Sequence, residues 1–268
     1  MLNIILFNIF IILFILFIVM LLLIGVFLLV RGIQTKMNNI IIAAIGFIGL
    51  PIGFIGYFVF NLSGLFQEIF VFIAYISTVV FTNSTFYKRK KRGLNHYTNW
   101  ILIITIILGV IQIILFVIPI FLGIKVYYLR VALDTLYTFI TFNWLAWAAF
   151  QSYKRLKEYN VEPWIKVRYK LLGIFSFIIS FNNIPEFFQP VGTAWGDSDN
   201  IVSLVVFGIS AILAVSFSIG FFVAWIMPNW LKRKINKNYT PSEDKEYSEE
   251  ELMQLIREQM DEESSSNN

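Results

Sequence analysis

The sequence predicts an all-α integral membrane protein, built as a bundle of seven transmembrane helices. Of its 268 residues, 58% are hydrophobic and only 14% are charged, whereas soluble domains contain about 45–50% apolar and about 25% charged residues. The charged residues are absent from long blocks, and the blocks match the roughly 20 apolar residues that a helix needs to cross a bilayer. The mean hydropathy of +0.73 agrees with a chain that lies mostly in lipid.

The seven spans are predicted from these apolar blocks, taken in chain order. They cover residues 3–30, 38–60, 64–86, 98–124, 126–150, 171–190 and 201–227. The first block has no basic residues before it and no small-residue cleavage site after it. Its apolar run is also about twice as long as that of a signal peptide. We therefore expect the first span to be retained as a helix.

Lys and Arg residues gather on one side of the predicted membrane. They follow the first, third, fifth and seventh spans, with the densest groups at 88–92, 154–170 and 232–237. The connections on the opposite side hold Lys125 as their one cation. Because cytoplasmic connections carry the excess of positive charge, we expect the N-terminus outside the cell and the C-terminus in the cytoplasm.

The second span contains a strip of glycines. Gly46, Gly49, Gly53 and Gly56 recur at steps of three and four residues, so they share one helix face. A face without side chains lets another helix approach closely, which stabilises contacts between helices in lipid. We expect this face to pack within the molecule rather than in a homodimer. Pro51 predicts a kink in the same helix.

The fifth span carries a polar stripe, which includes Arg130, Asp134 and Thr138 at steps of four residues. At 1.5 Å per residue, Asp134 lies about 12 Å from the start of this span, close to the membrane midplane. A charged side chain at that depth costs at least about 2.5–3.5 kcal/mol, so Asp134 is expected to face the bundle and to be paired. Arg130 is the nearest candidate partner, although Arg before Asp is the weaker order on a helix.

Further polar residues lie near the outer halves of the third and sixth spans. If these helices adjoin the fifth, their polar groups form an acidic cavity that opens to the outside. The predicted ligand-binding residues are Glu68, Arg130, Asp134, Asn182, Asn183 and Glu186. The alternative is that Arg130 and Asp134 form an internal strut, while the two glutamates are solvated at headgroup level.

Several classes of function are excluded by composition. The chain has no Cys and a single His, so thiolate nucleophiles, iron–sulfur clusters and His- or Cys-based zinc sites cannot form. His96 lies in a predicted cytoplasmic connection, and Asp134 is the one Asp inside a predicted span. We expect no catalytic residues, no metal site, no cofactor and no nucleic-acid partner.

The chain is predicted to divide into a transmembrane domain, 1–230, and a cytoplasmic tail, 231–268. The basic segment 151–170 is expected to bind anionic lipid headgroups at the cytoplasmic face. Residues 248–263 form a predicted acidic amphipathic helix that begins with a capping box at Ser248. These two segments are candidate docking sites for a cytoplasmic protein, and a disordered, solubilising tail is the alternative.

These features favour a receptor or sensor-like protein, without enzymatic activity, in the plasma membrane. It would bind a small ligand, a cation or a proton in the outward-facing cavity and couple this binding to a cytoplasmic partner. One alternative is a transporter or channel component that uses Asp134 as its intramembrane carboxylate. Another is a membrane scaffold or assembly subunit that binds no ligand.

Overall fold

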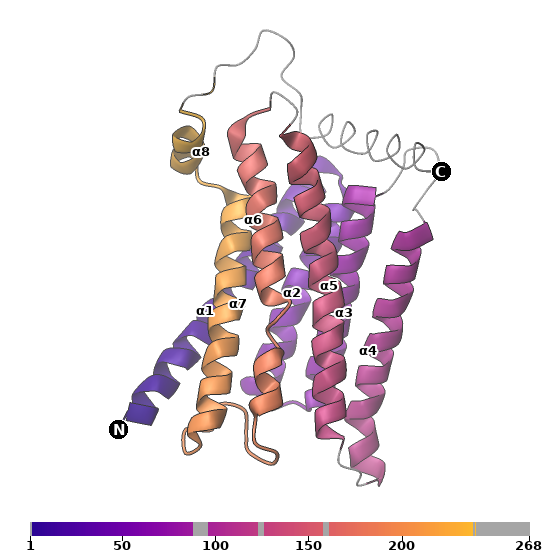
Figure 1. Ribbon diagram of the computed structural model, residues 1–268, viewed down its shortest axis with the longest axis vertical. Coiled ribbons are helices and arrows are strands. Elements are labelled where there is room, and N and C mark those ends of the chain that lie inside the picture. Colours follow the sequence, from indigo (N-terminus) through magenta and orange to yellow (C-terminus); the bar gives the residue numbers. More distant parts are fainter. Residues whose placement is uncertain (1, 88–95, 123–125, 158–160, 238, 240–268) are drawn as a thin grey trace.

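The computed structural model of the chain describes residues 2–87, 96–122, 126–157, 161–237 and 239. Within these ranges every regular element is a helix, and the long helices run along the long axis of the molecule (Figure 1). The long helices are α1 (Leu2–Thr35), α2 (Asn38–Phe58), α3 (Gly64–Thr82), α4 (His96–Leu122), α5 (Tyr127–Leu156), α6 (Pro163–Ile179) and α7 (Ile201–Ile226). The short elements are the π-helix η1 (Asn83–Tyr87), the 3-10 helix η2 (Ile184–Phe188) and α8 (Asn229–Ile235).

Six of the described segments are long and apolar enough to cross a membrane. They are α1, α2, α3 with η1, α4, α6 with η2, and α7. The chain is therefore a multi-pass helical membrane protein, as the composition predicts. The remaining predicted span, 126–150, corresponds to α5. This helix has 30 residues, but its mean hydropathy is too low for it to count among the candidate spans.

The connection between α5 and α6 is shorter than the predicted spans imply. α5 continues to Leu156, and α6 begins at Pro163 rather than at residue 171. Proline is favoured at the first position of a helix because its missing N–H has no helical acceptor there. Glu162, which precedes it, has the extended backbone expected of a residue before proline. Both helices thus run past the predicted spans at the end of the bundle that carries their basic residues.

Six helices form a ring in the order α1, α2, α3, α5, α6 and α7, and α7 closes it by packing on α1. α4 lies outside the ring against α3 and α5. The start of α1 and the connection from η2 to α7 lie at one end of the bundle, and α8 lies at the other end (Figure 1). We call these the N-terminal end and the α8 end.

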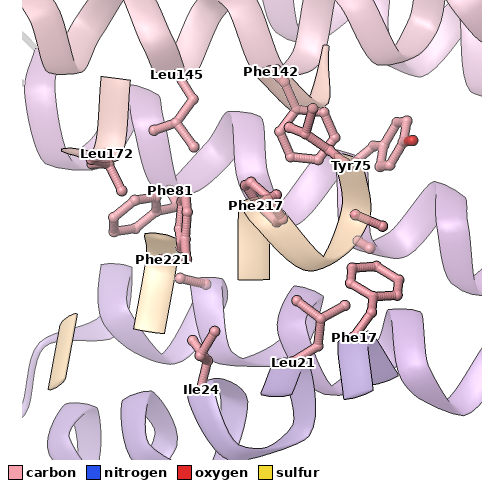
Figure 2. Close-up of a cluster of buried hydrophobic side chains, with 14 of the residues drawn as sticks. Phe17, Leu21, Ile24, Tyr75, Phe81, Phe142, Leu145, Leu172, Phe217 and Phe221 are labelled. Carbon is pink, nitrogen blue, oxygen red and sulfur yellow. The ribbon is translucent and has the colours of Figure 1, made fainter. Parts of the chain in front are cut away.

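The centre of the ring is filled by large apolar and aromatic side chains from most of its helices (Figure 2). Phe142 of α5 meets Phe217 of α7 with a distance of 5.3 Å between ring centroids, and Phe217 lies 4.6 Å from Phe221. Tyr75 of α3 packs edge-on against Phe142. Because lipid gives no hydrophobic drive to association, such close packing is what holds the helices together.

The four glycines of α2 lie against other helices of the same chain. A Cβ atom added at Gly46 would lie 3.0 Å from Ser77 Cβ, and one added at Gly53 would lie 2.8 Å from Phe70 Cβ, both on α3. At Gly56 the added atom would collide with the ring of Phe66. The missing side chains therefore let α3, which carries Glu68, approach α2 closely.

At the α8 end, a buried polar cluster joins α3, α4 and α5. The side chain of Asn83 in η1 donates from Nδ2 to the carbonyl of Thr98 at 2.9 Å and accepts from Trp144 Nε1 at 2.7 Å. Tyr87 stacks on the same tryptophan, with an interplanar angle of 14°. The cluster fixes α3 and α5 relative to each other, away from Glu68, Arg130 and Asp134, which lie toward the N-terminal end.

The tail begins with α8, which packs against the start of α6. Lys232 Nζ lies 4.3 Å from the ring centroid of Trp164, and Asn236 Oδ1 accepts from the backbone N–H of Trp164 at 3.2 Å. The predicted amphipathic helix 248–263 and the basic group 88–92 lie outside the described residues. The predicted boundary at residue 230 falls within α8.

Candidate functional site

A cavity of about 660 Å³ lies inside the ring, and all seven long helices contribute to its lining. It extends to the N-terminal end of the bundle, where Asn61 and Ala194, both exposed, belong to its lining. Toward the α8 end it stops at Phe142 and Phe217, the aromatic pair of the packed core. Cavities of about 300–1,000 Å³ are typical of small-molecule sites.

All six residues predicted to bind a ligand line this one cavity. Glu68 comes from α3, and Arg130 and Asp134 come from α5. Asn182 and Asn183 lie in the turn that follows α6, and Glu186 lies in η2. The convergence follows from the packing order, because α5 contacts both α3 and α6.

The charged side chains of the cavity interact electrostatically as a group. The charge of Asp134 acts on Glu68 and on Glu186, and that of Arg130 acts on all three carboxylates. Between Arg130 and Asp134, both described, no direct ion pair forms; the guanidinium lies over the ring of Phe116, 5.4 Å from its centroid. The structure thus does not contain the internal strut that was one reading of the sequence. Among the described lining residues, three carboxylates face one guanidinium, which is a surplus of acidic groups.

The predicted sixth span, which contains Asn182, Asn183 and Glu186, is interrupted beside the cavity. α6 ends at Ile179, and the chain then makes turns before η2 begins at Ile184. Pro185 accounts for this break, because its ring has no N–H to donate to the carbonyl of Phe181 and would clash with that carbonyl in a helix. In the sequence, Pro185 and Pro190 indicate a break at the end of the sixth span, and the irregular segment is what turns Asn182 and Asn183 toward the cavity.

The carbonyls released by the break find partners on neighbouring helices. Ser210 Oγ of α7 donates to the carbonyl of Asn182 at 3.2 Å, and Tyr127 Oη of α5 donates to the carbonyl of Glu186 at 3.1 Å. Within a membrane, irregular backbone is tolerated only where such partners or a polar cavity satisfy it. The interruption is therefore a built feature of the bundle.

A chain of side-chain hydrogen bonds crosses the cavity lining from α6 to α3. Asn182 Nδ2 donates to Asn183 Oδ1 at 3.2 Å, and Asn183 Nδ2 donates to Thr138 Oγ1 at 2.9 Å. Thr138 Oγ1 and Tyr75 Oη then share a hydrogen bond of 2.9 Å. Sequence reasoning missed Tyr75, although its position seven residues after Glu68 puts both on one face of α3.

Some buried polar atoms of the lining have no hydrogen-bond partner. They are Asn182 Oδ1, Gln189 Oε1 and Trp195 Nε1. Gln189 is 4% exposed, and its Nε2 is held by Ser203 Oγ and Thr193 Oγ1, each at 2.9 Å. Because buried polar groups are nearly always hydrogen-bonded, these three atoms are candidates for contact with an occupant of the cavity.

Aromatic rings form another part of the lining. The ring centroid of Phe14 on α1 lies 5.3 Å from those of Phe54 and Phe58 on α2. It lies 5.8 Å from that of Trp195, in the connection before α7. No sequence signal marks these rings, because the chain contains 28 Phe residues. The cavity therefore combines acidic and amide groups on α3, α5 and α6 with aromatic faces on α1 and α2.

The carboxylates of the lining come from three different elements, α3, α5 and η2. Among the described residues, no group of three or more His, Asp or Glu side chains is placed to hold a metal ion. Comparisons of the chain with protein-family models, with curated proteins and with solved structures find no match. The function has to be argued from the cavity itself.

Proposed function

We propose that this protein is a receptor or sensor-like membrane protein, without enzymatic activity, that binds a small ligand in the central cavity and passes the binding to a cytoplasmic partner. The observation that carries the proposal is the convergence of six charged and amide residues, from α3, α5, η2 and the turn after α6, on one cavity. The segments 151–170 and 248–263 are the proposed docking sites for the partner, with anionic lipid as a further ligand of the basic segment.

The proposal includes α5 as a seventh spanning helix. With 30 residues it is about 45 Å long, enough for a hydrocarbon core of about 30 Å. Its polar residues line the cavity, whereas its exposed side chains are mostly apolar and include Leu129, Leu136 and Phe139. A helix that lines a polar cavity does not need the composition of one surrounded by lipid.

Seven spans and the distribution of cations give the proposed orientation. The α8 end carries Lys154, Arg155 and the basic residues of α8, whereas the cavity extends to the other end. By the rule that cytoplasmic connections are positive, the cavity faces outward and the C-terminus lies in the cytoplasm. We place the protein in the plasma membrane, where an outward-facing cavity meets external ligands.

One observation favours the transporter alternative. Transporters often build their substrate sites from interrupted helices near the membrane midplane, and α6 is interrupted beside the cavity. Against it, Phe142, Phe217 and Phe221 pack tightly between the cavity and the α8 end. The scaffold alternative leaves the unpartnered polar atoms of the lining without a purpose, at about 1–3 kcal/mol each.

Cysteine labelling tests the orientation, because the chain has no cysteine of its own. Ser198→Cys lies in the connection before α7, and Lys157→Cys lies at the exposed end of α5. A membrane-impermeant thiol reagent should label the first variant in intact cells and the second only after permeabilisation. The reverse pattern would overturn the proposed orientation and, with it, an outward-facing binding site.

A further inference from the structure

We infer that the ligand of the cavity is an organic cation, with an ammonium group that carries N–H donors and an apolar or aromatic body. The inference rests on the proposed function and names the chemical class of its ligand. Four properties of the lining carry it: its charge, the spacing of its carboxylates, its unpartnered acceptors and its aromatic faces.

The charge of the lining calls for a cation. Among the described residues of the lining, Arg130 is the one basic side chain, and it faces Glu68, Asp134 and Glu186. The guanidinium lies over the ring of Phe116 and forms no direct ion pair with Asp134, so one positive charge is shared among three acidic groups. A buried carboxylate is stable when it is protonated or when it is paired with a positive charge, so the surplus acidic groups are suited to a positively charged occupant.

The spacing of the carboxylates favours an organic cation over a metal ion. Calcium and magnesium need several oxygen ligands gathered at about 2.0–2.6 Å, and no group of three carboxylates in the described part of the chain converges in that way. A cavity of about 660 Å³ also has room for far more than one ion. A molecule that extends between the acidic residues uses both the volume and the separation.

Two of the three unpartnered atoms of the lining are acceptors, which call for a hydrogen-bond donor on the ligand, whereas the third, Trp195 Nε1, is itself a donor. Gln189 Oε1 has no partner although the side chain is 4% exposed, and its amide is fixed by the hydrogen bonds of Nε2 to Ser203 and Thr193. Asn182 Oδ1 is likewise buried and unpartnered. Both atoms are acceptors, as are the carboxylates, so a primary or secondary ammonium satisfies them and a quaternary one does not.

The aromatic rings of the lining indicate that the remainder of the ligand is apolar or aromatic. Phe14, Phe54, Phe58 and Trp195 form contiguous edge-to-face and tilted contacts along the lining. Aromatic faces attract cations within about 6 Å, and they also pack against an apolar body. Neither a proton nor an inorganic ion would use this surface.

The test measures thermal unfolding of the purified full-length protein by tryptophan fluorescence, with matched probes. Two probes, 2-phenylethylamine and 4-phenylbutylamine, carry a primary ammonium group. Three further probes replace that group: 2-phenylethanol by a hydroxyl, phenylacetate by a carboxylate, and trimethyl(2-phenylethyl)ammonium by a quaternary cation. We expect a saturable rise in Tm with the amines, an apparent affinity at least about tenfold weaker for the quaternary cation, and no rise with the others. A rise with phenylacetate or with calcium chloride, equal binding of the quaternary cation, or no rise with either amine would overturn the inference.

Variants assign the binding to the cavity. Glu68→Gln and Asp134→Asn keep the size of the side chain and remove one negative charge, and each should weaken amine binding by about tenfold or more. Asp199→Asn, in the exposed connection before α7, is the matched control and should bind as the unaltered chain does. If Asp134→Asn fails to fold, Glu68→Gln alone decides the matter. Unchanged affinity in the folded cavity variants would contradict the assignment.

Failure of this inference is distinguishable from failure of the proposed function. Stabilisation by phenylacetate or by 2-phenylethanol, lost in the cavity variants, would leave an outward-facing ligand site and overturn only its cationic chemistry. Labelling that places Ser198→Cys on the cytoplasmic side would overturn the proposed function whatever the amines do. Uptake of radiolabelled 2-phenylethylamine into proteoliposomes, abolished by Asp134→Asn, would support the cationic ligand and assign the cavity to a transporter.

Discussion

At the scale of single residues, the sequence predicts the polar part of the cavity better than its apolar part. Glu68, Asp134 and Glu186 stand out because a charge within an apolar block is expensive and must face the interior. No sequence signal marks Trp195 or Phe14 as lining residues, because aromatic residues occur throughout a chain that lies in lipid. Their place in the lining follows from the fold alone.

The direct partner of Arg130 is a second case in which the sequence falls short. Spacing along α5 makes Asp134 the nearest carboxylate, but the guanidinium lies instead over Phe116 of α4. A contact with a neighbouring helix depends on how the two helices pack, which spacing within one helix does not contain. The same limit applies to Tyr75, whose partner Thr138 belongs to another helix.

The glycines of α2 give a prediction at this scale, because their surroundings differ. A Cβ at Gly53 would lie 2.8 Å from Phe70 Cβ, which cannot move without its backbone, whereas at Gly49 the nearest atom, on the Phe70 ring, lies 3.6 Å away. We expect Gly53→Ala to lower the free energy of unfolding by about 1–3 kcal/mol. Gly49→Ala should be neutral or raise it by up to about 1 kcal/mol, since alanine is the better helix former.

Reversible unfolding in mixed detergent micelles measures both changes under the same conditions. Gly49→Ala serves as the control, because it makes the same chemical change one turn away on the same helix face. Two neutral or stabilising substitutions would show that α2 and α3 do not pack as closely as the structure has them. Similar destabilisation in both would instead point to a general need for flexibility in α2.

At the scale of elements, the sequence predicts the helices and misses how two of them are interrupted. The prolines of the sixth span indicate a break, but not that the chain leaves the helix at residue 180 and resumes as η2. The π-helix η1 has no marker in the sequence at all; it is sustained by the buried contacts of Asn83 with Thr98 and Trp144. Such interruptions depend on partners that are distant in the chain.

The break in α6 is expected to depend on Pro185. Pro185→Ala restores an N–H that can donate to the carbonyl of Phe181 and removes the clash that ends the helix, an effect of about 3 kcal/mol in favour of continued helix. We expect slower amide hydrogen exchange over residues 181–186, together with weaker binding of 2-phenylethylamine as Asn182 and Glu186 turn away. Pro190→Ala, beyond η2, should change neither measurement. Unaltered exchange in Pro185→Ala would show that Ser210 and Tyr127 hold the break by themselves.

At the scale of the whole molecule, the composition of α5 and its position in the bundle lead to different conclusions on whether it crosses the membrane. The helix lacks the apolar average of the other spans, yet it lies in the ring between α3 and α6. An average over the sequence mixes its cavity-lining face with its outer face, which are adapted to different surroundings. The number of spans can therefore be read from average composition only where a helix is apolar on all its faces, as α1 and α4 are.

The outer face of α5 supplies the test of the seventh span. Leu136 is 45% exposed and lies roughly 14 Å along the helix from its start, near the midplane of a bilayer about 30 Å thick. If α5 crosses the membrane, Leu136→Lys places an ammonium in the lipid. This should make insertion and folding less favourable by at least about 2.5–3.5 kcal/mol. The yield of membrane-inserted protein and its Tm in detergent measure this loss.

The same charge placed at the end of α5 is the matched control for Leu136→Lys. Tyr128 is 57% exposed and lies in the first turn of the helix, where a lysine reaches the membrane surface, so Tyr128→Lys should be tolerated. Two well-tolerated variants would mean that water surrounds the outer face of α5, and the bundle would then have the six spans that composition alone supports. A selective loss at Leu136 requires lipid at that depth, and with it an odd number of crossings that places the two ends of the described chain on opposite sides of the membrane.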